Sequence, residues 1–365
     1  MSDIRQAFKG RKILVTGHTG FKGAWLSLWL ADAGASVHGV ALDPDLCGGL
    51  YPLLSPDVFA SDQRCDLRDG EKLAGMVAAI QPDYVFHLAA QPLVRRSFAQ
   101  PIETLEVNIL GSAHVLEAVR RLGRCCHVIF VTSDKCYRNE EWVHAYRETD
   151  RLGGKDPYSM SKAAAELVAE CWRQSFFARD GFGSQIVSVR AGNVIGGGDY
   201  SEDRLVPDCV RAVTGGPALA IRSPASTRPW QHVLDCLHGY LTVAAKLPLL
   251  GPALAGDVFN FGPAGGGDHT VLQVAREFLR LWGAPEDAVQ VVRGGDDKPE
   301  AGYLAVSIDK AARLLGWRPV WDFHAAMAQS VGWYRARHEG SADMHALSVG
   351  QIREFEASAQ LIRPC

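Results

Sequence analysis

The stretch Ile13-Leu14-Val15-Thr16-Gly17-His18-Thr19-Gly20-Phe21-Lys22-Gly23 indicates the fold class, because it joins a short buried strand to a helix through a glycine-rich turn. The start of a helix offers unpaired N–H groups and partial positive charge, and glycines let a pyrophosphate approach the backbone. The G-x-x-G-x-x-G spacing differs from G-x-G-x-x-G but relies on the same physics. A tight strand-to-helix connection is the alternative. We assign a dinucleotide pyrophosphate to six residues of the turn: Gly17, Thr19, Gly20, Phe21, Lys22 and Gly23.

Outward from this turn, the first half of the chain alternates apolar runs with segments of helical spacing. Buried strands are expected at 13–16, 36–42, 84–88, 128–132 and 186–190. Helices are expected at 21–33, 70–80, 104–122 and 157–180. Repeated strand–helix units predict an α/β fold of Rossmann type, in which helices cover both faces of a doubly wound parallel sheet.

The composition changes after Arg190, where glycine, proline and arginine become frequent. We expect residues 1–190 to form a dinucleotide-binding domain, to which a segment near 233–262 returns. Residues 191–232 and 263–338 would form a smaller C-terminal lobe over the carboxyl edge of the sheet, where open α/β folds bind ligands. The tail, 339–365, is weakly patterned and fits either an appended helix or a disordered end.

The bulk composition is that of an ordinary globular protein. Of 365 residues, 47% are apolar and 22% charged, and a net charge of -3 gives no general attraction to nucleic acid or anionic lipid. Short apolar segments predict no membrane span, and the N-terminus lacks the apolar core of a signal peptide, so a cytoplasmic location is expected. Nine cysteines without a C-x-x-C pair, and histidines without ligand spacing, predict reduced thiols and no metal.

A carboxylate at the end of the second strand indicates which dinucleotide binds. Asp43 can accept hydrogen bonds from a ribose diol and would repel a 2′-phosphate, and no Arg or Lys adjoins it in Leu42-Asp43-Pro44-Asp45. NAD is therefore favoured over NADP, with an exposed loop aspartate as the alternative. Further cofactor contacts are expected from Asp66 and Leu67, and from Leu88, Ala89 and Ala90 at the end of the strand 84–88. A simple turn explains Asp66-Leu67 nearly as well.

Two strings supply acid, base and hydroxyl groups: Thr132-Ser133-Asp134-Lys135-Cys136-Tyr137 and Tyr158-Ser159-Met160-Ser161-Lys162. Tyr158 and Lys162 are one helical turn apart and share a helix face, where the ammonium would lower the pKa of the phenol. This couple indicates alcohol oxidation by hydride loss. Asp134 and Lys135 exceed what a plain dehydrogenase needs, which suggests an elimination as well. A surface pair and a strand-end salt bridge are the respective alternatives.

These strings resemble the extended short-chain dehydrogenases/reductases that act on nucleotide sugars, over about residues 8–338. Ser133, Tyr158 and Lys162 match the family triad in order and spacing. Within the family, the chain is most similar to the CDP-glucose 4,6-dehydratases. Besides 17–23 and 132–137, the matching strings are Gly153-Gly154-Lys155-Asp156-Pro157-Tyr158-Ser159, Arg190-Ala191-Gly192-Asn193-Val194-Ile195-Gly196-Gly197-Gly198-Asp199 and Arg228-Pro229-Trp230-Gln231-His232-Val233.

The resemblance implies NAD-dependent conversion of CDP-glucose to CDP-4-dehydro-6-deoxyglucose, for deoxysugar and surface polysaccharide synthesis. Tyr158 would take the C4 hydroxyl proton as NAD accepts the C4 hydride, with Ser133 on the same oxygen. Lys162 would hold the tyrosinate and the nicotinamide ribose. Water would then leave across C5–C6 with Asp134 as the acid, and the hydride would return to C6.

Lys135 stands where the dTDP-glucose dehydratases resemble Asp-Glu, whose glutamate is the natural C5 base. A free lysine has a pKa of about 10.4, so it is a poor base unless it is desolvated or crowded by positive charge. Lys162 and the nicotinamide would supply that crowding. Alternatively, Lys135 stays protonated and stabilises the developing enolate. Proton transfer is slightly favoured.

Residues beyond the sheet would hold the sugar and the diphosphate: Asn193, Arg204, Leu205, Val206, Arg228 and His232. Guanidinium forks suit phosphate oxygens, although a surface arginine explains Arg204 equally well. His232 would line the nucleotide pocket or pack the lobe. Asn108 is expected on the cofactor side, where it would help to fix the catalytic helix; a plain helix residue is the alternative.

The resemblance also pairs helices 104–122 and 157–180 across a homodimer or tetramer. Apolar positions on these helices fit such a face, and equally fit packing on their own sheet: Val115, Leu116, Val119, Leu167 and Val168. Two other functions stay open. A nucleotide-sugar 4-epimerase, or a dehydratase for another nucleotide, needs the same triad; a non-catalytic NAD-binding protein needs neither the tyrosine nor the lysine.

Overall fold

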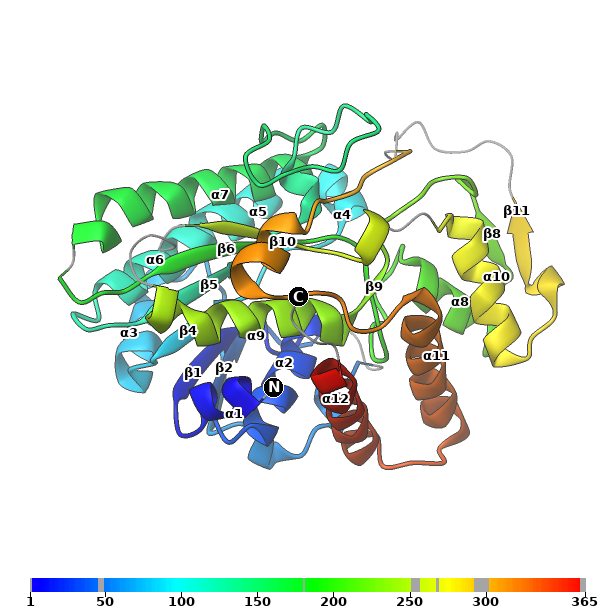
Figure 1. Ribbon diagram of the computed structural model, residues 1–365, viewed down its shortest axis with the longest axis horizontal. Coiled ribbons are helices and arrows are strands. Elements are labelled where there is room, and N and C mark those ends of the chain that lie inside the picture. The colour runs from blue at the N-terminus through cyan, green and yellow to red at the C-terminus, as the bar shows by residue number, and fades with distance from the viewer. Residues whose placement is uncertain are drawn as a thin grey trace.

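Seven parallel strands form the central sheet of the protein in the computed structural model, which describes residues 2–44, 49–179, 181–250, 257–266, 269–291 and 302–361 (Figure 1). The strands are β1 (Lys12–Thr16), β2 (Ser36–Ala41), β3 (Ser61–Arg64), β4 (Tyr84–His87), β5 (His127–Val131), β6 (Ile186–Ala191) and β10 (Val258–Phe261). Their order, β10-β6-β5-β4-β1-β2-β3, changes direction between β1 and β4. There the strand ends frame the crevice in which doubly wound sheets bind ligands. The predicted Rossmann-type fold is confirmed.

Each strand feeds two cores, because successive side chains point to opposite faces of the sheet. In β1, Ile13 and Val15 pack under α1 (Ser2–Phe8), α2 (Phe21–Asp32) and α9 (Val233–Leu250). Leu14 faces the other way, toward α3 (Gly70–Ile80), α6 (Gly111–Arg120) and α7 (Pro157–Ser175). The apolar strands are therefore buried on both sides, as parallel sheets require.

Helix α2 is buried around its whole circumference from Gly23 to Leu30. Its two indole N–H groups both find acceptors: Trp25 donates to the carbonyl of Gly197 at 2.8 Å, and Trp29 to Glu356 Oε1 at 2.9 Å. Glu356 belongs to α12 (Met344–Leu361), which packs on α2 and buries Phe355 in the same core. Of the two alternatives for the tail, residues 344–361 adopt the helix.

The expected helix 104–122 is wrong in one respect, because three elements replace it: α5 (Pro101–Leu105), a π-helical turn (Glu106–Leu110) and α6. The wide turn directs Asn108 inward, and such bulges often mark functional positions. The expected helix 157–180 ends earlier, at Ser175. Strand β3 was not identified from the sequence, because its polar residues at the sheet edge lack an apolar pattern.

The smaller lobe lies beyond the carboxyl edge of the sheet, on the right in Figure 1. Its helices are α8 (Leu205–Val213), α10 (Val271–Trp282) and α11 (Phe323–Glu339), and α10 packs on both others. Two short ladders complete it: β7 (Val194–Ile195) with β9 (Gln231–His232), and β8 (Leu219–Ile221) with β11 (Val289–Val291). Between these two parts of the lobe in the sequence, α9 and β10 return to the main sheet, where β10 pairs with β6.

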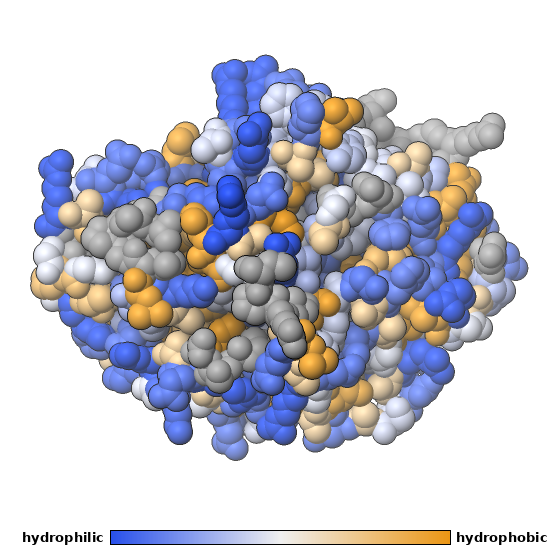
Figure 2. All heavy atoms as spheres, in the orientation of Figure 1, coloured by the Kyte–Doolittle hydropathy of each residue, from blue (hydrophilic) through white to orange (hydrophobic). Residues whose placement is uncertain are grey.

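Three of the five residues considered for a subunit interface belong to the protein's own core. Val115, Leu116 and Val119 are buried between α6, α3 and the sheet. Leu167 is 61% exposed, and Val168 is partly buried. Over the face drawn in Figure 2, apolar residues lie in scattered groups among hydrophilic ones. None of the helices within the described ranges is long and apolar enough to cross a bilayer.

Candidate active site

The glycine-rich turn between β1 and α2 is too close-packed to carry side chains at two of its glycines. Gly17 has a φ of +75°, and a Cβ there would lie 2.8 Å from the backbone of Ala89. A Cβ on Gly23 would lie 2.1 Å from the carbonyl oxygen of Gly17. Helix α2 begins after Gly20, and no side chain caps its first turn. This backbone cradle at a helix N-terminus has the donors that a pyrophosphate needs, so it fits a dinucleotide.

The side chains of the turn reach its neighbours. Thr19 Oγ1 donates to the carbonyl of Leu42 at 3.0 Å, which ties the turn to the end of β2. Lys22 Nζ donates to the hydroxyl of Tyr240 in α9 at 3.4 Å. Phe21 lies against Gly196, where a Cβ would stand 3.2 Å from its ring. The turn is therefore anchored on both the sheet and the second half of the chain.

Asp43, which follows β2, is joined by a basic residue that the sequence did not reveal. Arg64, the last residue of β3, donates from Nε to Asp43 Oδ1 at 2.7 Å. The expectation that no Arg or Lys stands beside Asp43 holds along the chain but is wrong in space, because β3 pairs with β2 and sets Arg64 opposite Ala41. The carboxylate is still exposed at the rim, where a ribose diol would meet it.

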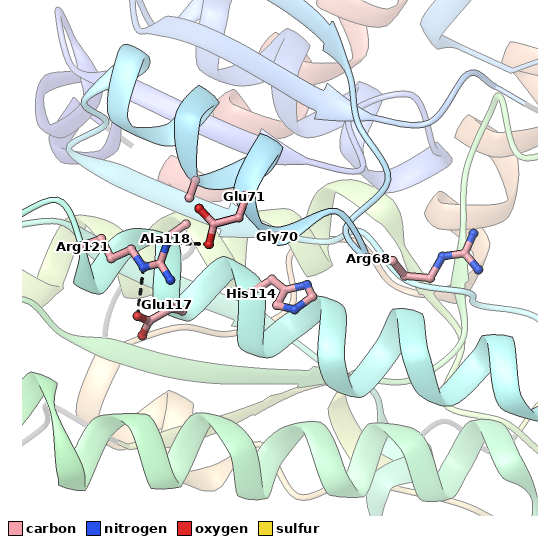
Figure 3. A pocket seen from close by; sticks show the side chains of 8 residues that line it. Arg68, Gly70, Glu71, His114, Glu117, Ala118 and Arg121 are labelled. Carbon is pink, nitrogen blue, oxygen red and sulfur yellow. Dashed lines mark hydrogen bonds and ion pairs between the residues drawn. The ribbon is translucent and has the colours of Figure 1, made fainter.

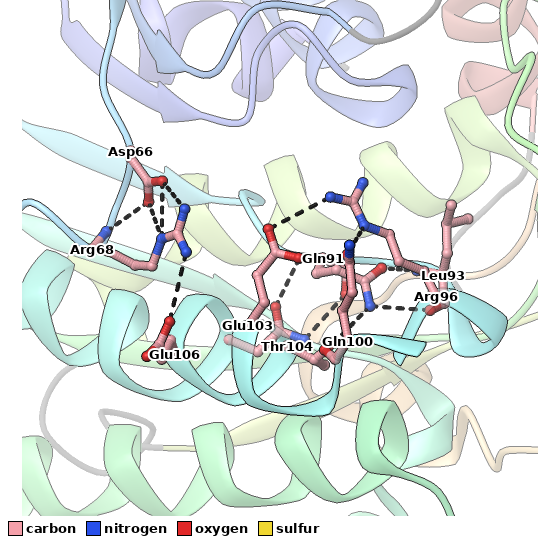
Figure 4. Close-up of polar contacts among 10 residues, drawn as sticks. Asp66, Arg68, Gln91, Leu93, Arg96, Gln100, Glu103, Thr104 and Glu106 are labelled. Atoms are coloured by element: carbon pink, nitrogen blue, oxygen red, sulfur yellow. Dashed lines mark hydrogen bonds and ion pairs between the residues drawn. The ribbon is translucent and has the colours of Figure 1, made fainter. Parts of the chain in front are cut away.

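Asp66 and Leu67 mainly serve the turn after β3. The Asp66 carboxylate accepts from the backbone N–H of Arg68 at 2.9 Å and from its guanidinium NH2 at 2.6 Å (Figure 4). These hydrogen bonds lower the pKa of Asp66. Leu67 is buried, and its carbonyl accepts from His114 Nδ1 at 2.7 Å. Contact of either residue with an adenine stays a prediction.

Small residues follow β4 directly above the glycine-rich turn. The N–H of Leu88 donates to the carbonyl of Thr16 at 3.2 Å, and that of Ala89 to Thr16 Oγ1 at 3.3 Å. Leu88, Ala89 and Ala90 all remain partly exposed. A ligand lying along the crevice between β1 and β4 would therefore pass over them.

Asn108 joins this crevice to the helix that carries Tyr158. Its amide nitrogen donates to Ser161 Oγ in α7 at 2.8 Å and to the carbonyl of Gln91 at 3.1 Å. Its oxygen accepts from the N–H of Gln91 at 2.8 Å. Asn108 therefore ties the segment around Gln91 to α7, and a part in cofactor binding stays a prediction.

Ser133, Asp134 and Lys135 follow β5 in a tight turn. Ser133 Oγ donates to Asp134 Oδ1 at 3.0 Å, and Lys135 Nζ lies 3.6 Å from the same oxygen. Asp134 is fully buried, and its Oδ2 has no hydrogen-bond partner among the described residues. A Cβ on Gly192 would stand 3.0 Å from that Oδ2. A buried carboxyl with one unused oxygen is suited to exchange a proton with a bound ligand.

Tyr158 and Lys162 lie near the start of α7. Asp156 caps this helix by accepting the N–H of Ser159 at 2.9 Å, and Ser97 Oγ accepts the N–H of Tyr158 at 3.2 Å. Both functional side chains are buried. The helix is therefore held at its first turn, where the two groups stand.

Burial has the largest effect on the pKa values of Tyr158 and Lys162. It raises the pKa of Tyr158 to about 12, and a hydrogen bond with Ser133 and the charge of Arg204 offset only part of the rise. Burial likewise lowers the pKa of Lys162 to about 8, with the charge of Lys22 acting in the same direction. In the protein alone, desolvation therefore outweighs the groups that lower the pKa of the phenol, and the lowering by Lys162 stays a prediction.

A buried ion pair lies beneath the couple, and it was not predicted from the sequence. Arg190, near the end of β6, donates from Nε to Glu166 Oε1 at 2.8 Å, and each side chain is 3% exposed. Glu166 also accepts from Thr132 Oγ1, and Arg190 donates to the hydroxyl of Tyr137 at 2.8 Å. Glu166 stands one turn after Lys162, so this spacing is the one available signal. The pair locks α7 to β5 and β6.

Two of the expected lobe residues lie close to the catalytic cluster. Arg204 directly precedes α8, and its Nε lies 3.9 Å from Asp199 Oδ2. It is also near enough to Tyr158 for its positive charge to lower the pKa of the phenol. Asn193 has a buried Oδ1 with no hydrogen-bond partner among the described residues, which a ligand donor would satisfy. Leu205 and Val206 begin α8, partly buried and buried respectively.

The string 228–233 runs past the same cluster. Pro229 lies against Gly192, where a Cβ would stand 2.4 Å from its ring. Arg228 is buried and donates to the carbonyl of Thr227 at 2.8 Å. His232 is fully buried with its ring 4.8 Å from that of Trp321, and burial lowers its pKa to about 3. The ring thus packs within the lobe, while its Nε2 has no hydrogen-bond partner among the described residues, and contact of His232 with a ligand stays a prediction.

A pocket between α3 and α6 lies apart from these groups (Figure 3). Three of its charged side chains pair with one another, since Arg121 contacts Glu71 at 2.9 Å and Glu117 at 3.1 Å, and Arg68 pairs with Asp66 and Glu106 outside the pocket. None of the predicted catalytic residues lines it. Within the described part of the chain, no group of three or more His, Cys, Asp or Glu side chains could hold a metal ion.

Comparison with known proteins supplies independent information. A profile of the GDP-mannose 4,6 dehydratase family matches residues 14–330. The CDP-glucose 4,6-dehydratase of Salmonella typhimurium is 44% identical over 351 residues, which are 95% of this chain and 97% of that protein. A solved epimerase of Methanothermobacter thermautotrophicus is 26% identical with a TM-score of 0.77, covering 94% of this chain and 98% of its own. The dTDP-glucose 4,6-dehydratase of Streptomyces venezuelae, solved with NAD bound, is 26% identical with a TM-score of 0.75, covering 91% and 99%.

Proposed function

Because the chain belongs to the GDP-mannose 4,6 dehydratase family, we propose that it removes water from CDP-glucose to give CDP-4-dehydro-6-deoxyglucose, with NAD as an internal redox cofactor. One observation carries the proposal: the buried carboxyl of Asp134, with an unused oxygen, stands beside the hydroxyls of Ser133 and Tyr158. Of these three groups, the oxidation of a hydroxyl needs only Ser133 and Tyr158. The additional carboxyl of Asp134 suits an elimination. The cytidine base is supported by likeness to the Salmonella enzyme.

Oxidation at C4 would use Tyr158, Ser133 and Lys162. NAD, when bound, would accept the C4 hydride and later return it to C6. Tyr158 would take the C4 hydroxyl proton, and Ser133 would hydrogen-bond the same oxygen. Because burial holds the pKa of Tyr158 near 12, proton removal needs positive charge close to the phenol. Lys162 would provide it and hold the nicotinamide ribose.

Elimination across C5–C6 would use the residues that follow Ser133. Once C4 is a ketone, the C5 proton is acidic, and the C6 hydroxyl needs a proton to leave as water. Asp134 would supply that proton through its unused Oδ2. Lys135, whose ammonium is 3.6 Å from Asp134 Oδ1, would either take the C5 proton or stabilise the enolate.

Two substitutions separate these roles of Lys135. Lys135→Arg keeps a positive charge but cannot act as a base, because a guanidinium stays protonated. If Lys135 is the C5 base, both Lys135→Arg and Lys135→Ala should lose incorporation of solvent deuterium at C5, by about 100-fold or more. If it stabilises the enolate, Lys135→Arg should retain most of the incorporation and Lys135→Ala should not. Mass spectrometry of the product in D₂O measures both.

The rest of the nucleotide sugar would be held at the carboxyl edge and by the lobe. Asp43, Asp66 and the glycine-rich turn would bind the cofactor, with 1–190 and the segment near 233–262 as its domain. Asn193, Arg204 and Arg228 would meet the sugar and diphosphate from the lobe, 191–232 and 263–338. Asn193 Oδ1 has no hydrogen-bond partner among the described residues, which supports contact of Asn193 with the substrate. The burial of His232 does not support such a contact.

A homodimer through α6 and α7 is part of the proposal. Large apolar side chains are exposed along this part of the chain: Ile102, Leu110, Met160 and Leu167. Leu167, at 61% exposure in the middle of α7, would be central to such an interface. Analytical ultracentrifugation of the wild type and of Leu167→Glu checks it, and a monomeric wild type would contradict it.

Product mass tests the reaction itself. The purified protein is incubated without added cofactor with CDP-, dTDP-, UDP- and GDP-linked hexoses. Loss of one water from CDP-glucose alone is expected, and it would also reveal retained NAD. An unchanged mass with an inverted stereocentre would support the 4-epimerase alternative, which has no use for Asp134 and Lys135. No turnover even with NAD supplied would contradict the substrate assignment.

A further inference from the structure

The cluster around Arg64 is built more firmly than an ordinary surface ion pair. From its place at the end of β3, the guanidinium donates from NH2 to the hydroxyl of Tyr51 at 2.6 Å and from NH1 to Asp62. Asp62 in turn pairs with Nε2 of the fully buried His18 at 2.7 Å. The guanidinium also lies over the ring of Tyr51, 5.5 Å from its centre. Arg64 is thus held from several sides next to the glycine-rich turn.

Asp43 contributes little to that support. Its side chain is 85% exposed, whereas that of Arg64 is 33% exposed. Arg64 Nε donates to Asp43 Oδ1 at 2.7 Å, and the other nitrogens of the guanidinium contact Asp62, Tyr51 and, at 3.5 Å, His18 Nε2. Removal of the Asp43 carboxylate would therefore leave Arg64 in place with one N–H facing the rim. A guanidinium so placed, beside the residue expected to meet the adenosine ribose, has the chemistry of a phosphate receptor.

We propose that Arg64 is a latent receptor for a ribose 2′-phosphate, and that its pairing with Asp43, rather than Asp43 alone, decides between NAD and NADP. The proposal rests on the proposed use of a nicotinamide dinucleotide. With Asp43 present, the carboxylate accepts from the ribose diol, repels a dianion and occupies the guanidinium. With an uncharged residue at 43, the Nε–H of the guanidinium is open to a phosphate, and the repulsion from the Asp43 carboxylate is gone, while Asp62 continues to hold the opposite side of Arg64.

A competition for binding, without catalysis, tests this. The protein is equilibrated with equal concentrations of NAD and NADP, freed of unbound nucleotide by rapid gel filtration and denatured, and the released dinucleotides are quantified. Wild type should retain mainly NAD. Asp43→Asn should raise the ratio of NADP to NAD on the order of tenfold or more, an effect that salt weakens. The double variant Asp43→Asn with Arg64→Leu should lose this gain.

The control variant removes an equivalent carboxylate elsewhere. Glu277 in α10 pairs with Arg280 at 2.8 Å within the lobe, so Glu277→Gln should leave the ratio unchanged. The proposal is overturned if the Asp43→Asn variant still binds NAD but retains no more NADP than wild type. It is also overturned if the double variant with Arg64→Leu keeps the raised ratio of NADP to NAD. If the wild-type protein retains neither dinucleotide, both the proposed function and this proposal are contradicted. If Asp43→Asn does not fold, Asp43→Ser takes its place with the same expected gain, and the absence of that gain overturns the proposal.

Discussion

The end of β5 and the ends of β2 and β3 lie at the same edge of the sheet, yet they hold their charges in opposite ways. Beyond β5, Asp134 is fully buried with one unused oxygen, and the Glu166–Arg190 pair beneath it is 3% exposed on each side. Beyond β2, the Asp43 carboxylate is 85% exposed. Asp134 and Tyr158, which are proposed to move protons, are thus kept from water, whereas Asp43, which is proposed to select a ligand, stays at the rim. Substitutions should cost far more in the first region.

The largest effect is expected from Tyr158→Phe. This change removes the hydroxyl proposed as the C4 base but keeps the ring, so the turnover rate should fall by about 10³-fold with little loss of stability. Turnover of CDP-glucose by the purified variant measures it. Tyr84→Phe is the matched control, because Tyr84 is also a buried tyrosine but opens β4 at the opposite end of the sheet. Its activity should equal that of wild type; a Tyr158→Phe variant with more than a tenth of wild-type activity would remove Tyr158 from the mechanism.

The next effect compares two acid–arginine pairs for stability. Glu166→Gln leaves the buried guanidinium of Arg190 without its counter-charge and should cost about 3–5 kcal/mol. Asp66→Asn breaks the pair with Arg68 near the adenosine side, which is partly exposed, and should cost less than about 1 kcal/mol. Urea denaturation followed by circular dichroism measures both. Equal losses would mean that burial does not separate the two regions energetically.

The elements that set up both regions could largely be predicted, because their signals are local in sequence. The glycine-rich turn follows its strand directly, and Tyr158 and Lys162 stand one helical turn apart. The unused oxygen of Asp134 agrees with the acid role expected from its place beside Ser133. Spacing along the chain is sufficient for such features because a single strand end or helix face carries them.

Features that depend on packing between distant segments could not be predicted. Arg64 reaches Asp43 only because β3 pairs with β2, and the polar sequence of β3 conceals that strand. Glu166 and Arg190 stand on elements that were expected, but nothing in either neighbourhood indicates that they meet. The direction of the pKa shift of Tyr158 could not be predicted either, because desolvation depends on all the groups packed around the phenol.

The smallest effect is a difference in the pH dependence of stability. Burial lowers the pKa of Lys162 from an ordinary 10.5 to about 8. Below pH 8 the lysine is protonated in both states, and the folded protein bears the cost of a buried ammonium. Between pH 8 and 10.5 the folded state has released the proton and the unfolded state still holds it. The unfolded state then binds more protons, so this group makes stability rise with pH, by at most about 1.4 kcal/mol per unit.

Lys162→Met isolates this contribution, because it removes the ammonium and keeps an unbranched side chain. The free energy of unfolding of the variant should exceed that of wild type at pH 7, and the gap should close between pH 8 and 10. Tyr158 and the buried cysteines have raised pKa values, which lower stability above pH 9 in both proteins. Their contributions cancel when the free energy of unfolding of the wild type is subtracted from that of the variant. On the adenosine side the sign is opposite. Hydrogen bonds from Tyr51, Arg64 and His18 outweigh burial and lower the pKa of Asp62, so its contribution is lost only in acid. A gap that stayed constant from pH 7 to 10 would mean that Lys162 is solvated when folded, and the contrast between a dry catalytic region and a wet rim would then fail at its central residue.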